Sequence, residues 1–447
     1  MRRFDSFRER LAECADLPCL FTEGSWSSYA DLRTAVDIWT GRVEALRLPA
    51  GSVVGLQSDY SLDAVALLLA LCARGVVSAL IPQGPEGDGY LRDALASGVF
   101  VVSSDGTYRW ESRTPASSHP LLEHIRTAGD AGLVIFTSGS SGRPKAALHS
   151  LERFLHKFQK PGRRFHTLAF LLFDHIAGLD TLFYTLSNGG ALIFTRARDP
   201  RSICALIAQA RVEVLPASPS FLRLLCASGE ATDHDLSSLR IVTYGSEPMD
   251  PATLARLNEL FPNARISQKY GTTETGAPRT VSRGNDSLWL QLRGDGLETR
   301  IVEGVLWIRS EGALLGYLNA PSPVNDDGWY CTGDLAEQDG DWIHILGRAS
   351  DLINVGGEKV SPVEVEQVIL ELDFVAAAAV SGTRHPLLGQ IVTATVSLCT
   401  AKDPRQVEKR IRAHCRERLP RYKVPVTVDV VDAALTSGRQ KVLRQRD

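Results

Sequence analysis

Short runs of consecutive apolar residues recur along the first three quarters of the chain, and each run ends in a loop of Gly, Ser, Thr or Pro residues. These run-and-loop segments span residues 132–140, 191–195, 212–218, 239–248 and 264–276. Segments with helical periodicity separate them, for example 201–210, 219–228 and 250–261. Apolar strands that alternate with helices are typical of parallel sheets covered by helices on both faces. Since ligands of such folds bind outside the carboxyl ends of the strands, we expect these loops to meet at one crevice.

The pattern changes in the last third of the chain. From about 290 to 346, short strands alternate with Asp-Gly and similar turns, which predicts antiparallel pairing. After the GRASD segment (347–351), a capping box from Ser361 to Glu364, with Pro362 at the first helical position, predicts a new helix. Two β-rich runs follow, and then a helix with an apolar residue at every fourth position: Val407, Ile411, Cys415 and Leu419.

Together these patterns predict an α/β protein of two domains. A chain of 447 residues is too long for a single compact core. We expect a large N-terminal domain of parallel sheets flanked by helices, with a small β-rich part, and a small C-terminal α+β domain.

Composition and charge exclude several classes of protein. The net charge of -3 gives no electrostatic reason to expect a nucleic-acid partner. The eight cysteines are scattered without a C-x-x-C pair, which argues against a zinc site or a disulfide framework and fits a reduced cytoplasm. The most apolar run, 65–81, is interrupted by Arg74 and Gly75, so it predicts a helix followed by a buried strand rather than a membrane span.

The loop TSGSSGRPKA (137–146) has the residue types that bind phosphate: hydroxyls, glycines and a lysine. It is not a Walker loop, because Pro144 precedes Lys145 and the required Gly-Lys-Ser/Thr never follows. A hydroxyl-rich loop with one lysine suits the phosphates of a leaving pyrophosphate. Taken alone, the segment is more typical of an ordinary surface loop.

Further motifs follow this loop in a fixed order. They are YGTTETG (270–276), EGVLWIRSEGALLGYLNAP (303–321), YCTGDL (330–335), GRASDLINVGGEKVSPVEVE (347–366) and KVLR (441–444). With these motifs the chain resembles the acyl-adenylate-forming superfamily, which includes acyl- and aryl-CoA synthetases, peptide-synthetase adenylation domains and luciferase. The resemblance covers nearly the whole chain, from residue 26 to the terminal lysine.

The resemblance implies a nucleotide site. Tyr270 would lie against the adenine, Asp334 would accept the ribose hydroxyls as a carboxylate acceptor, and Arg348 would reach the ribose or phosphate. The YGSEP loop would form the other wall of the adenine slot. The positions assigned to ATP are Thr137, Ser138, Gly139, Ser140, Ser141, Gly142, Lys145, Gly245, Ser246, Glu247, Pro248, Tyr270, Gly271, Thr272, Asp334 and Arg348.

The resemblance also implies catalytic residues. Thr272 or Thr273 would donate to the α-phosphate, and Glu274 would hold Mg²⁺ through oxygen. Lys441 would bridge the substrate carboxylate and the ester oxygen. We prefer Lys441 to Arg439 because the KVLR run matches the family, although Gln440 stands where the family commonly has glycine.

The remaining assignments concern the hinge, the thiol and the acid. The resemblance implies an N-terminal adenylation core at 1–347, a hinge at 348–351, placed at Ser350 or Asp351, and a mobile C-terminal domain at 352–447. Gly356 and Gly357 would let a pantetheine arm pass close to the backbone. The acyl pocket would involve Asp174, His175 and Gly276. Asp174 either meets an amine nitrogen of the substrate or is a structural Asp bonded to backbone.

The implied function is ATP-dependent activation of a small carboxylic acid to acyl-AMP, with release of pyrophosphate, followed by transfer to a thiol. We expect Mg²⁺ as cofactor and coenzyme A as the thiol. One alternative is a stand-alone adenylating enzyme that loads a carrier-protein phosphopantetheine. A second is a non-catalytic nucleotide-binding regulator. We expect a cytoplasmic protein with no nucleic-acid partner and no membrane span.

Overall fold

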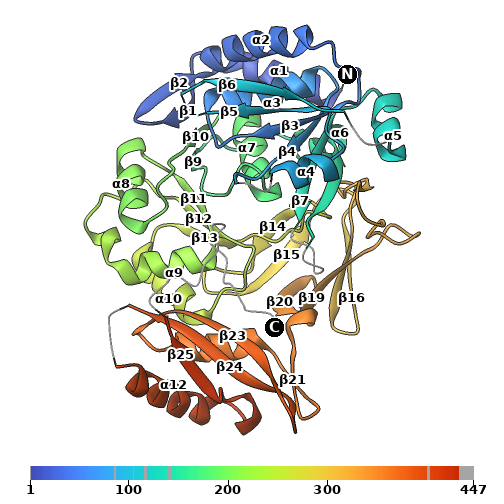
Figure 1. Cartoon of the computed structure of the whole chain (residues 1–447). Coiled ribbons are helices and arrows are strands. Elements are labelled where there is room, and N and C mark those ends of the chain that lie inside the picture. The colour runs from blue at the N-terminus through green and yellow to red at the C-terminus, as the bar shows by residue number, and fades with distance from the viewer. Residues whose placement is uncertain are drawn as a thin grey trace.

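The computed structural model describes residues 2–84, 87–103, 105–114, 118–137, 143–399 and 403–431, and within these ranges it contains four β-sheets (Figure 1). One seven-stranded sheet is parallel except at its last pair, β1 with β2. Its strands are, in spatial order, β13 (Arg265–Gln268), β12 (Ile241–Tyr244), β11 (Val214–Ala217), β9 (His166–Leu168), β10 (Ala191–Ile193), β1 (Pro18–Thr22) and β2 (Ser25–Ser28).

The second seven-stranded sheet is parallel in its centre and antiparallel at both edges. Its strands are, in spatial order, β18 (Gly316–Tyr317), β8 (Lys145–Ser150), β7 (Gly132–Thr137), β4 (Val77–Leu80), β3 (Val53–Gln57), β5 (Gly98–Val102) and β6 (Tyr108–Ser112). The edge pair β7–β8 is a hairpin, and the two-residue strand β18 adds to it from a distant part of the sequence.

Helices connect the strands of both sheets. Three of them begin in the same way, with Pro at the first helical position after an Asp or Ser whose side chain accepts a backbone N–H of the first turn. These are α8 (Pro200–Ala210), α9 (Pro219–Ser228) and α10 (Pro251–Leu260). The others are α1 (Arg3–Glu13), α2 (Tyr29–Ala45), α3 (Leu62–Ala73), α4 (Gly87–Asp93), α5 (Pro120–Ala128), α6 (Leu151–Phe154) and α7 (Ile176–Ser187), with 3₁₀ turns η1 (His156–Phe158) and η2 (Glu230–Thr232).

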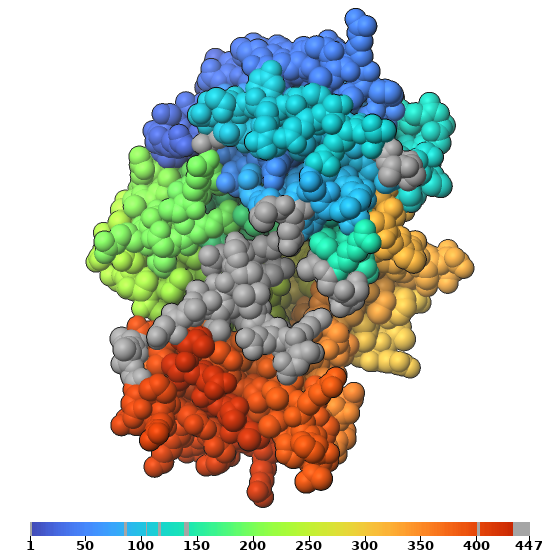
Figure 2. Space-filling model, viewed as in Figure 1, coloured from blue at the N-terminus to red at the C-terminus, as the bar shows by residue number. Residues whose placement is uncertain are grey.

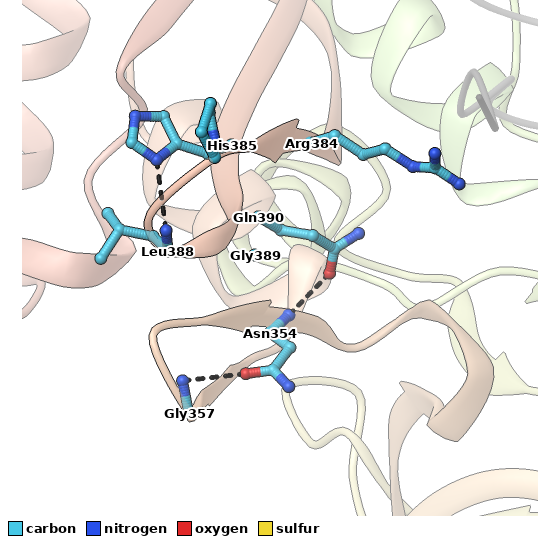
Figure 3. Close-up of a pocket in the computed structure, with 8 residues that line it drawn as sticks. Asn354, Gly357, Arg384, His385, Leu388, Gly389 and Gln390 are labelled. Carbon is cyan, nitrogen blue, oxygen red and sulfur yellow. Dashed lines mark hydrogen bonds between the residues drawn. The ribbon is translucent and has the colours of Figure 1, made fainter.

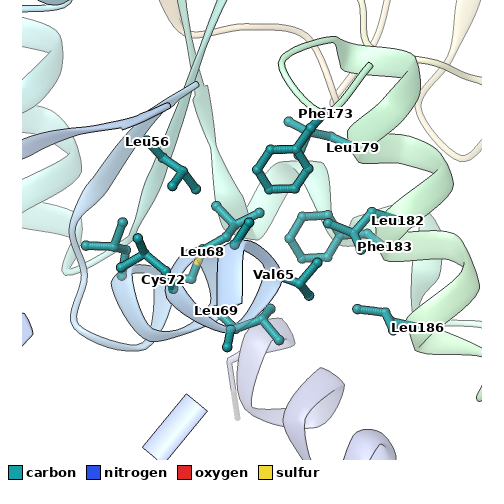
Figure 4. Close-up of a cluster of buried hydrophobic side chains, with 14 of the residues drawn as sticks. Leu56, Val65, Leu68, Leu69, Cys72, Phe173, Leu179, Leu182, Phe183 and Leu186 are labelled. Carbon is teal, nitrogen blue, oxygen red and sulfur yellow. The ribbon is translucent and has the colours of Figure 1, made fainter. Parts of the chain in front are cut away.

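Helix α3 lies inside the protein rather than on its surface. Figure 4 shows Val65 and Leu68 of α3 facing Phe183 and Leu186 of α7, and all four side chains are buried. Each such side chain contributes about 1.5–3 kcal/mol by burial. The apolar run 65–81 therefore forms a buried helix followed by strand β4, as predicted. Among the described residues, we find no helix with the length and apolarity needed to cross a bilayer.

A six-stranded sheet follows, and every pairing in it is antiparallel, as the turn-rich pattern predicted. Its strands are, in spatial order, β14 (Arg279–Ser282), β15 (Trp289–Arg293), β20 (Trp342–Arg348), β19 (Tyr330–Asp339), β17 (Val305–Arg309) and β16 (Glu298–Val302). In register, Asp334 pairs with Arg348 across β19 and β20.

The C-terminal part forms its own sheet and its own core, below the other sheets in Figure 1. After η3 (Ala349–Asp351), the strands are β22 (Glu358–Val360), β21 (Ile353–Val355), β24 (Gly389–Leu398) and β23 (Val375–His385), with β25 (Thr427–Val430) parallel to β24. The helices are α11 (Pro362–Leu370) and α12 (Pro404–Arg418), with η4 (Arg421–Lys423). These arrangements confirm the predicted fold class.

One local prediction is wrong. Helix α11 begins at Pro362 as expected, but the Ser361 side chain makes no capping hydrogen bond. The other half of the predicted box, Glu364, instead accepts two hydrogen bonds from Lys423 Nζ, each 2.7 Å long. A charge-assisted contact with an ammonium group is stronger than a bond to a backbone N–H, so Glu364 turns away from the cap.

The C-terminal part touches the rest of the chain through α9 and α10. The Gln367 side chain of α11 donates to the Met249 carbonyl (3.5 Å), and Arg256 of α10 forms an ion pair with Asp373 (2.5 Å). The Asp373 side chain is 94% exposed, so that ion pair contributes little.

Candidate active site

Side-chain contacts link the predicted 264–276 loop to Lys145, Tyr317 and Asp334, which come from other parts of the sequence. The Lys145 ammonium lies 5.2 Å from the centre of the Tyr317 ring, and the Tyr317 hydroxyl donates to Glu274 (2.6 Å). Four residues before Glu274, the Tyr270 hydroxyl donates to Asp334 (2.6 Å). On the face shown in Figure 2, the teal-green segment after residue 143 lies above the orange C-terminal part of the chain.

The lysine of the 137–146 loop has a fixed position at the start of strand β8. Lys145 pairs directly with Thr137 across the β7–β8 hairpin. The Asn319 side chain bonds to both of its neighbours: it donates to the Pro144 carbonyl (2.9 Å) and accepts from the Ala146 N–H (2.8 Å). The loop therefore joins two strands, whereas a Walker loop joins a strand to a helix. The predicted phosphate ligands Ser138, Gly139, Ser140, Ser141 and Gly142 lie outside the described residues.

The YGTTETG segment forms a turn that is closed by its own side chains. The Thr272 hydroxyl lies 3.1 Å from the Thr275 hydroxyl and accepts from the Thr275 N–H (3.1 Å). Gly271 is required here, because a Cβ atom would lie 2.6 Å from the Gly276 carbonyl oxygen. Thr272 is buried and used inside the turn, whereas Thr273 is half-buried. Of the two threonines proposed for the α-phosphate, the geometry favours Thr273.

Glu274 is a buried carboxylate whose neighbours are donors. Besides Tyr317, the Tyr330 hydroxyl donates a hydrogen bond to Glu274. The negative charge of Glu274 also interacts with the guanidinium of Arg348. Sequence analysis assigned no role to Tyr317, although it lies within the quoted 303–321 motif. Its contact depends on the pairing of β18 with β8, which joins residues about 170 positions apart.

The donor set around Glu274 fits Mg²⁺. Mg²⁺ prefers oxygen ligands and is usually bound through one or two carboxylates together with substrate phosphates. Glu274 supplies one such carboxylate, and the Tyr317 side chain that donates to it also contacts Lys145. Among the described residues there is no group of three or more His, Cys, Asp or Glu side chains that would form an all-protein metal site. When bound, Mg²⁺ would neutralise phosphate charge there.

Glu274→Gln is expected to raise the KM for Mg·ATP by about ten- to a hundredfold, because it removes a charged ligand worth about 1.5–3 kcal/mol. The amide oxygen of Gln can still accept from Tyr317, so the turn should stay intact. Pyrophosphate release measured over a Mg²⁺ titration checks this, with the exposed Glu311→Gln as matched control. An unchanged Mg²⁺ dependence would contradict the role of Glu274.

The predicted ribose residues form one connected group. Asp334 accepts a hydrogen bond from Tyr270 through one oxygen and forms an ion pair with Arg348 through the other, with Nε 2.8 Å away. Arg348 also donates to the Thr332 carbonyl (2.9 Å). Burial and the neighbouring Asp334 raise the pKa of Tyr270, so it stays a hydrogen-bond donor. Asp334 is 7% exposed, and burial raises its pKa while Arg348 opposes that effect.

The YGSEP loop follows strand β12 and packs against the start of the YGTTETG segment. A Cβ atom at Gly245 would lie 2.6 Å from the Lys269 carbonyl oxygen, so only glycine fits this approach. Ser246 adopts a positive φ of 68°, a conformation that non-glycine residues rarely take. Glu247 accepts from the Ser220 hydroxyl (2.6 Å) and so points toward the start of α9. Pro248 is half-buried.

The residues predicted for the acyl pocket lie at the start of helix α7. His175 is the N-cap residue of α7, without a capping hydrogen bond from its side chain, and is half-buried. Asp174 lies close enough to Arg198 to raise the pKa of that guanidinium, against the larger lowering by burial. Asp174 therefore already interacts with a cation of the protein. This argues against the alternative in which Asp174 binds an amine nitrogen of the substrate. Gly276 closes the turn described above, with a φ of 73°.

Sequence analysis also missed His149, a buried side chain beneath the YGTTETG segment. It is 1% exposed, and neither ring nitrogen makes a hydrogen bond of good geometry, although the Thr273 backbone lies near. Burial lowers the pKa of His149 to about 4, against a smaller opposite effect from Thr273.

This low pKa predicts a loss of stability in mild acid. The unfolded chain binds a proton at His149 below pH ~6.5, but the folded chain binds it only near pH 4, so stability falls as the pH drops through that range. At pH 5 the expected loss is about 2 kcal/mol relative to pH 7. Urea unfolding of His149→Leu should show a correspondingly smaller loss, whereas the exposed His124→Leu should behave as the parent. Equal pH dependence in all three would contradict the assignment.

The glycine pair predicted for the thiol lies elsewhere. Gly356 and Gly357 form the turn between β21 and β22, both with positive φ. Figure 3 shows this turn beside a surface recess of ≈ 740 Å³, lined also by Asn354 and Gln390, which bond to each other (2.9 Å). No contact joins Gly356 or Gly357 to the nucleotide residues within the described ranges.

Two other predicted sites remain to be placed. Ser350 and Asp351, proposed for the hinge, lie in η3 directly after β20, and the Ser350 hydroxyl donates to Asp351 (3.0 Å). Lys441, proposed as the catalytic lysine, lies outside the described residues. The hinge and the catalytic lysine thus stay predictions.

Comparisons with known proteins agree with this geometry. A model of the AMP-binding enzyme family matches residues 7–318, and a model of the AMP-binding enzyme C-terminal domain matches residues 364–439. The chain is 28% identical to the long-chain-fatty-acid–CoA ligase FadD13 of Mycobacterium tuberculosis, over 93% of this chain and 89% of that protein. It is 31% identical to the feruloyl-CoA synthase of an Amycolatopsis species, over 70% of this chain and 69% of that protein.

A solved structure shows the same fold. The anthranilate CoA ligase AuaEII, in complex with anthranoyl-AMP, superimposes with a TM-score of 0.83 and 21% sequence identity, and the match covers 99% of this chain and 95% of that chain. The family models together match most of the chain, and the first covers Lys145, Tyr270, Glu274 and Tyr317 of the crevice. The chain therefore belongs to the AMP-binding enzyme family.

Proposed function

We propose that this protein is an acid–thiol ligase that activates a small carboxylic acid with ATP and transfers the acyl group to coenzyme A. In the first step a carboxylate oxygen attacks the α-phosphorus, the bond to the β-phosphate oxygen breaks, and pyrophosphate leaves. In the second step the thiol sulfur attacks the acyl carbon, AMP leaves, and the thiol proton passes to solvent. The two steps balance without a redox partner.

The observation that carries this proposal is that the 270–276 turn connects a group of residues suited to a nucleoside with a group suited to phosphate and Mg²⁺. Tyr270, Asp334 and Arg348 form a group suited to a nucleoside, and Glu274 with Lys145 forms a group suited to phosphate and Mg²⁺. Thr273 lies between them. A nucleotide bound along this line has its α-phosphate next to Thr273, which is where the first step takes place.

The chain's own residues would bind, orient and exclude water rather than exchange protons. Asp334 fixes the ribose and Lys145 neutralises charge on the leaving phosphates, so the carboxylate meets the α-phosphorus in a fixed geometry. The acid enters from the side of α7, where His175 and Gly276 lie. Lys441, supplied by the C-terminal part, would neutralise charge on the attacking carboxylate.

We infer that the second step requires a different arrangement of the C-terminal part. The Gly356–Gly357 turn lies on an exposed surface and is separate from the nucleotide residues. A rotation about Ser350–Asp351 would bring this turn to the crevice and remove Lys441 from it. The polar contacts described above, Gln367 with Met249 and Arg256 with the exposed Asp373, are weak and are compatible with such a movement.

An ATP-dependent hydroxamate screen over carboxylic acids tests the proposal. At least one acid should give hydroxamate and pyrophosphate in equal amounts, and adding coenzyme A should convert the trapped intermediate into the thioester. Thioester formation with a holo-carrier protein but not with coenzyme A would overturn the choice of thiol and favour the carrier-loading alternative. Failure of all acids to support ATP–pyrophosphate exchange would favour a non-catalytic nucleotide-binding protein.

A further inference from the structure

The YGSEP loop continues into a segment, residues 247–250, that helix α9 holds by two polar contacts. The first is at Glu247, which accepts hydrogen bonds from both the N–H (3.3 Å) and the hydroxyl (2.6 Å) of Ser220, in the first turn of α9. The second lies about one turn further along the same face of α9, where Arg223 forms an ion pair with Asp250. Because the spacing is three residues on both sides, α9 holds the segment at its two ends.

The ion pair at the far end of the segment is buried. The Arg223 and Asp250 side chains are only 7% and 2% exposed. Arg223 Nε also donates to the Thr253 hydroxyl (3.2 Å), and Asp250 accepts from the Thr253 N–H (2.8 Å) as the N-cap of α10. Helices α9 and α10 lie side by side (Figure 1), so this one guanidinium fixes the start of α10 against α9. A buried ion pair is often no more stabilising than apolar side chains of the same size, so the geometry that it fixes is what distinguishes it.

The residues just before the segment have a backbone that needs such support. Ser246, with its φ of 68°, is in a region that non-glycine residues populate sparsely and keep only where the surrounding structure fixes them. On its N-terminal side, Gly245 packs so closely against the Lys269 carbonyl oxygen that a Cβ atom would lie 2.6 Å from it. On its C-terminal side are the two contacts from α9. Ser246 is therefore held between two fixed points.

Arg223 acts on this loop from behind. Among the residues that the structure describes, the polar partners of its side chain are Asp250 and Thr253, and neither belongs to the proposed nucleotide site. The YGSEP loop does belong to that site, as the wall of the adenine slot opposite Tyr270. Any effect of Arg223 on the nucleotide would thus pass through the position of the loop.

We propose that Arg223 is a positioning residue for ATP. Through Asp250 and Thr253 it keeps the YGSEP loop in the conformation that receives the adenine before the nucleotide binds. A wall that is set in advance spares ATP the free-energy cost of ordering the loop, and it favours the base whose shape fits. This inference rests on the proposed function, because it assumes that a nucleotide binds at this crevice with its base against the loop.

Two variants of the full chain test the inference. Arg223→Met keeps much of the length of the side chain but leaves Asp250 buried without its partner. The double variant Arg223→Met/Asp250→Asn removes both charges, and Asn can still cap α10, so it is the variant more certain to fold. Each should bind Mg·ATP about tenfold more weakly than the parent in calorimetric titration without acid, because the loop must then be ordered on binding.

Steady-state kinetics should locate the defect at the base. In both variants the KM for ATP should rise with the dissociation constant, and the preference for ATP over GTP should fall, while kcat and the KM for the acid change little. Arg223→Lys should fall between the parent and Arg223→Met, because an ammonium can keep the ion pair with Asp250 but lacks the fork that also reaches Thr253.

Two controls separate positioning from stability. Ile207→Ala, in the core beneath α8, should lower the thermal unfolding midpoint without changing the KM for ATP. Arg201→Met removes an ion pair with Glu230 in which the arginine side chain is 77% exposed, and it should change neither quantity.

The outcomes are distinct. If the double variant binds Mg·ATP as tightly as the parent, or if Ile207→Ala raises the KM for ATP as much as Arg223→Met does, Arg223 is structural only and the inference is overturned while the proposed function stands. If the parent protein itself does not bind Mg·ATP, the proposed function fails, and the role of Arg223 falls with it.

Discussion

Asp334→Ala is expected to lower kcat/KM for ATP by about a thousandfold. The bound ribose would lose a charged acceptor for its two hydroxyls, each such hydrogen bond is worth about 1.5–3 kcal/mol, and each 1.4 kcal/mol is about tenfold in rate. Asp334 accepts from Tyr270 and forms an ion pair with Arg348, so the alanine variant loses the ribose acceptor together with both of these contacts. Most of the effect should appear as a raised KM for ATP, since the reacting atoms lie on the far side of Thr273. Initial rates of pyrophosphate release at varied ATP measure it.

The matched control lies at the end of the same strand. Asp339→Ala removes an exposed carboxylate paired with Arg283, and it should change neither kcat nor KM for ATP appreciably. The Arg348 side chain is half exposed, so water can solvate it in Asp334→Ala and the thermal midpoint should fall only slightly. A large loss of stability with a small change in KM would show that Asp334 is structural and would contradict its role at the ribose.

Lys441→Ala is expected to slow acyl-adenylate formation by at least about a thousandfold. A single positioned charge at a developing anion commonly contributes about 2.7–4 kcal/mol, and Lys441 would also orient the attacking carboxylate. The second step should be nearly unaffected, because the lysine would have left the crevice before the thiol enters. Single-turnover measurements separate the two steps: ATP plus acid for the first, and preformed acyl-AMP plus coenzyme A for the second.

Two other variants sharpen this test. Lys409→Ala removes an exposed lysine of α12 in the same part of the chain and should leave both steps unchanged. Arg439→Ala addresses the register, since Arg439 is the other basic residue that could take this role. If Lys441→Ala formed acyl-AMP at the parent rate while Arg439→Ala did not, the catalytic assignment would move to Arg439.

Many of the helices and strands could be predicted because the local pattern of apolar and polar residues determines them. The apolar run 239–248 became β12 and its loop, and 250–261 became α10, since a buried parallel strand and a capped helix each have a signature within ten residues. The roles of Asp334 and Arg348 could also be predicted, because both residues lie in family motifs. Its geometry depends on one antiparallel register.

What sequence reasoning missed depends on contacts between distant segments. Tyr317 meets Glu274 only because β18 pairs with β8, and nothing near residue 317 predicts a two-residue edge strand. The failed cap at Ser361 has the same origin, since the Glu364 of the expected box is bound by Lys423, 59 residues away.

The β7–β8 hairpin has a consequence for how the phosphate contacts can be measured. Thr137 and Lys145 are held opposite each other by the sheet, and Asn319 anchors the residues on both sides of Lys145. The entropic cost of bringing the two ends of the intervening segment together therefore arises when the sheet forms, and ATP binding does not add to it. Substitutions of the serines at 138, 140 and 141 should then leave Lys145 in place. In a double-mutant cycle, the effects of a serine and a Lys145 substitution on ATP binding should therefore add, and any departure from additivity would indicate that the two residues interact through the bound phosphate.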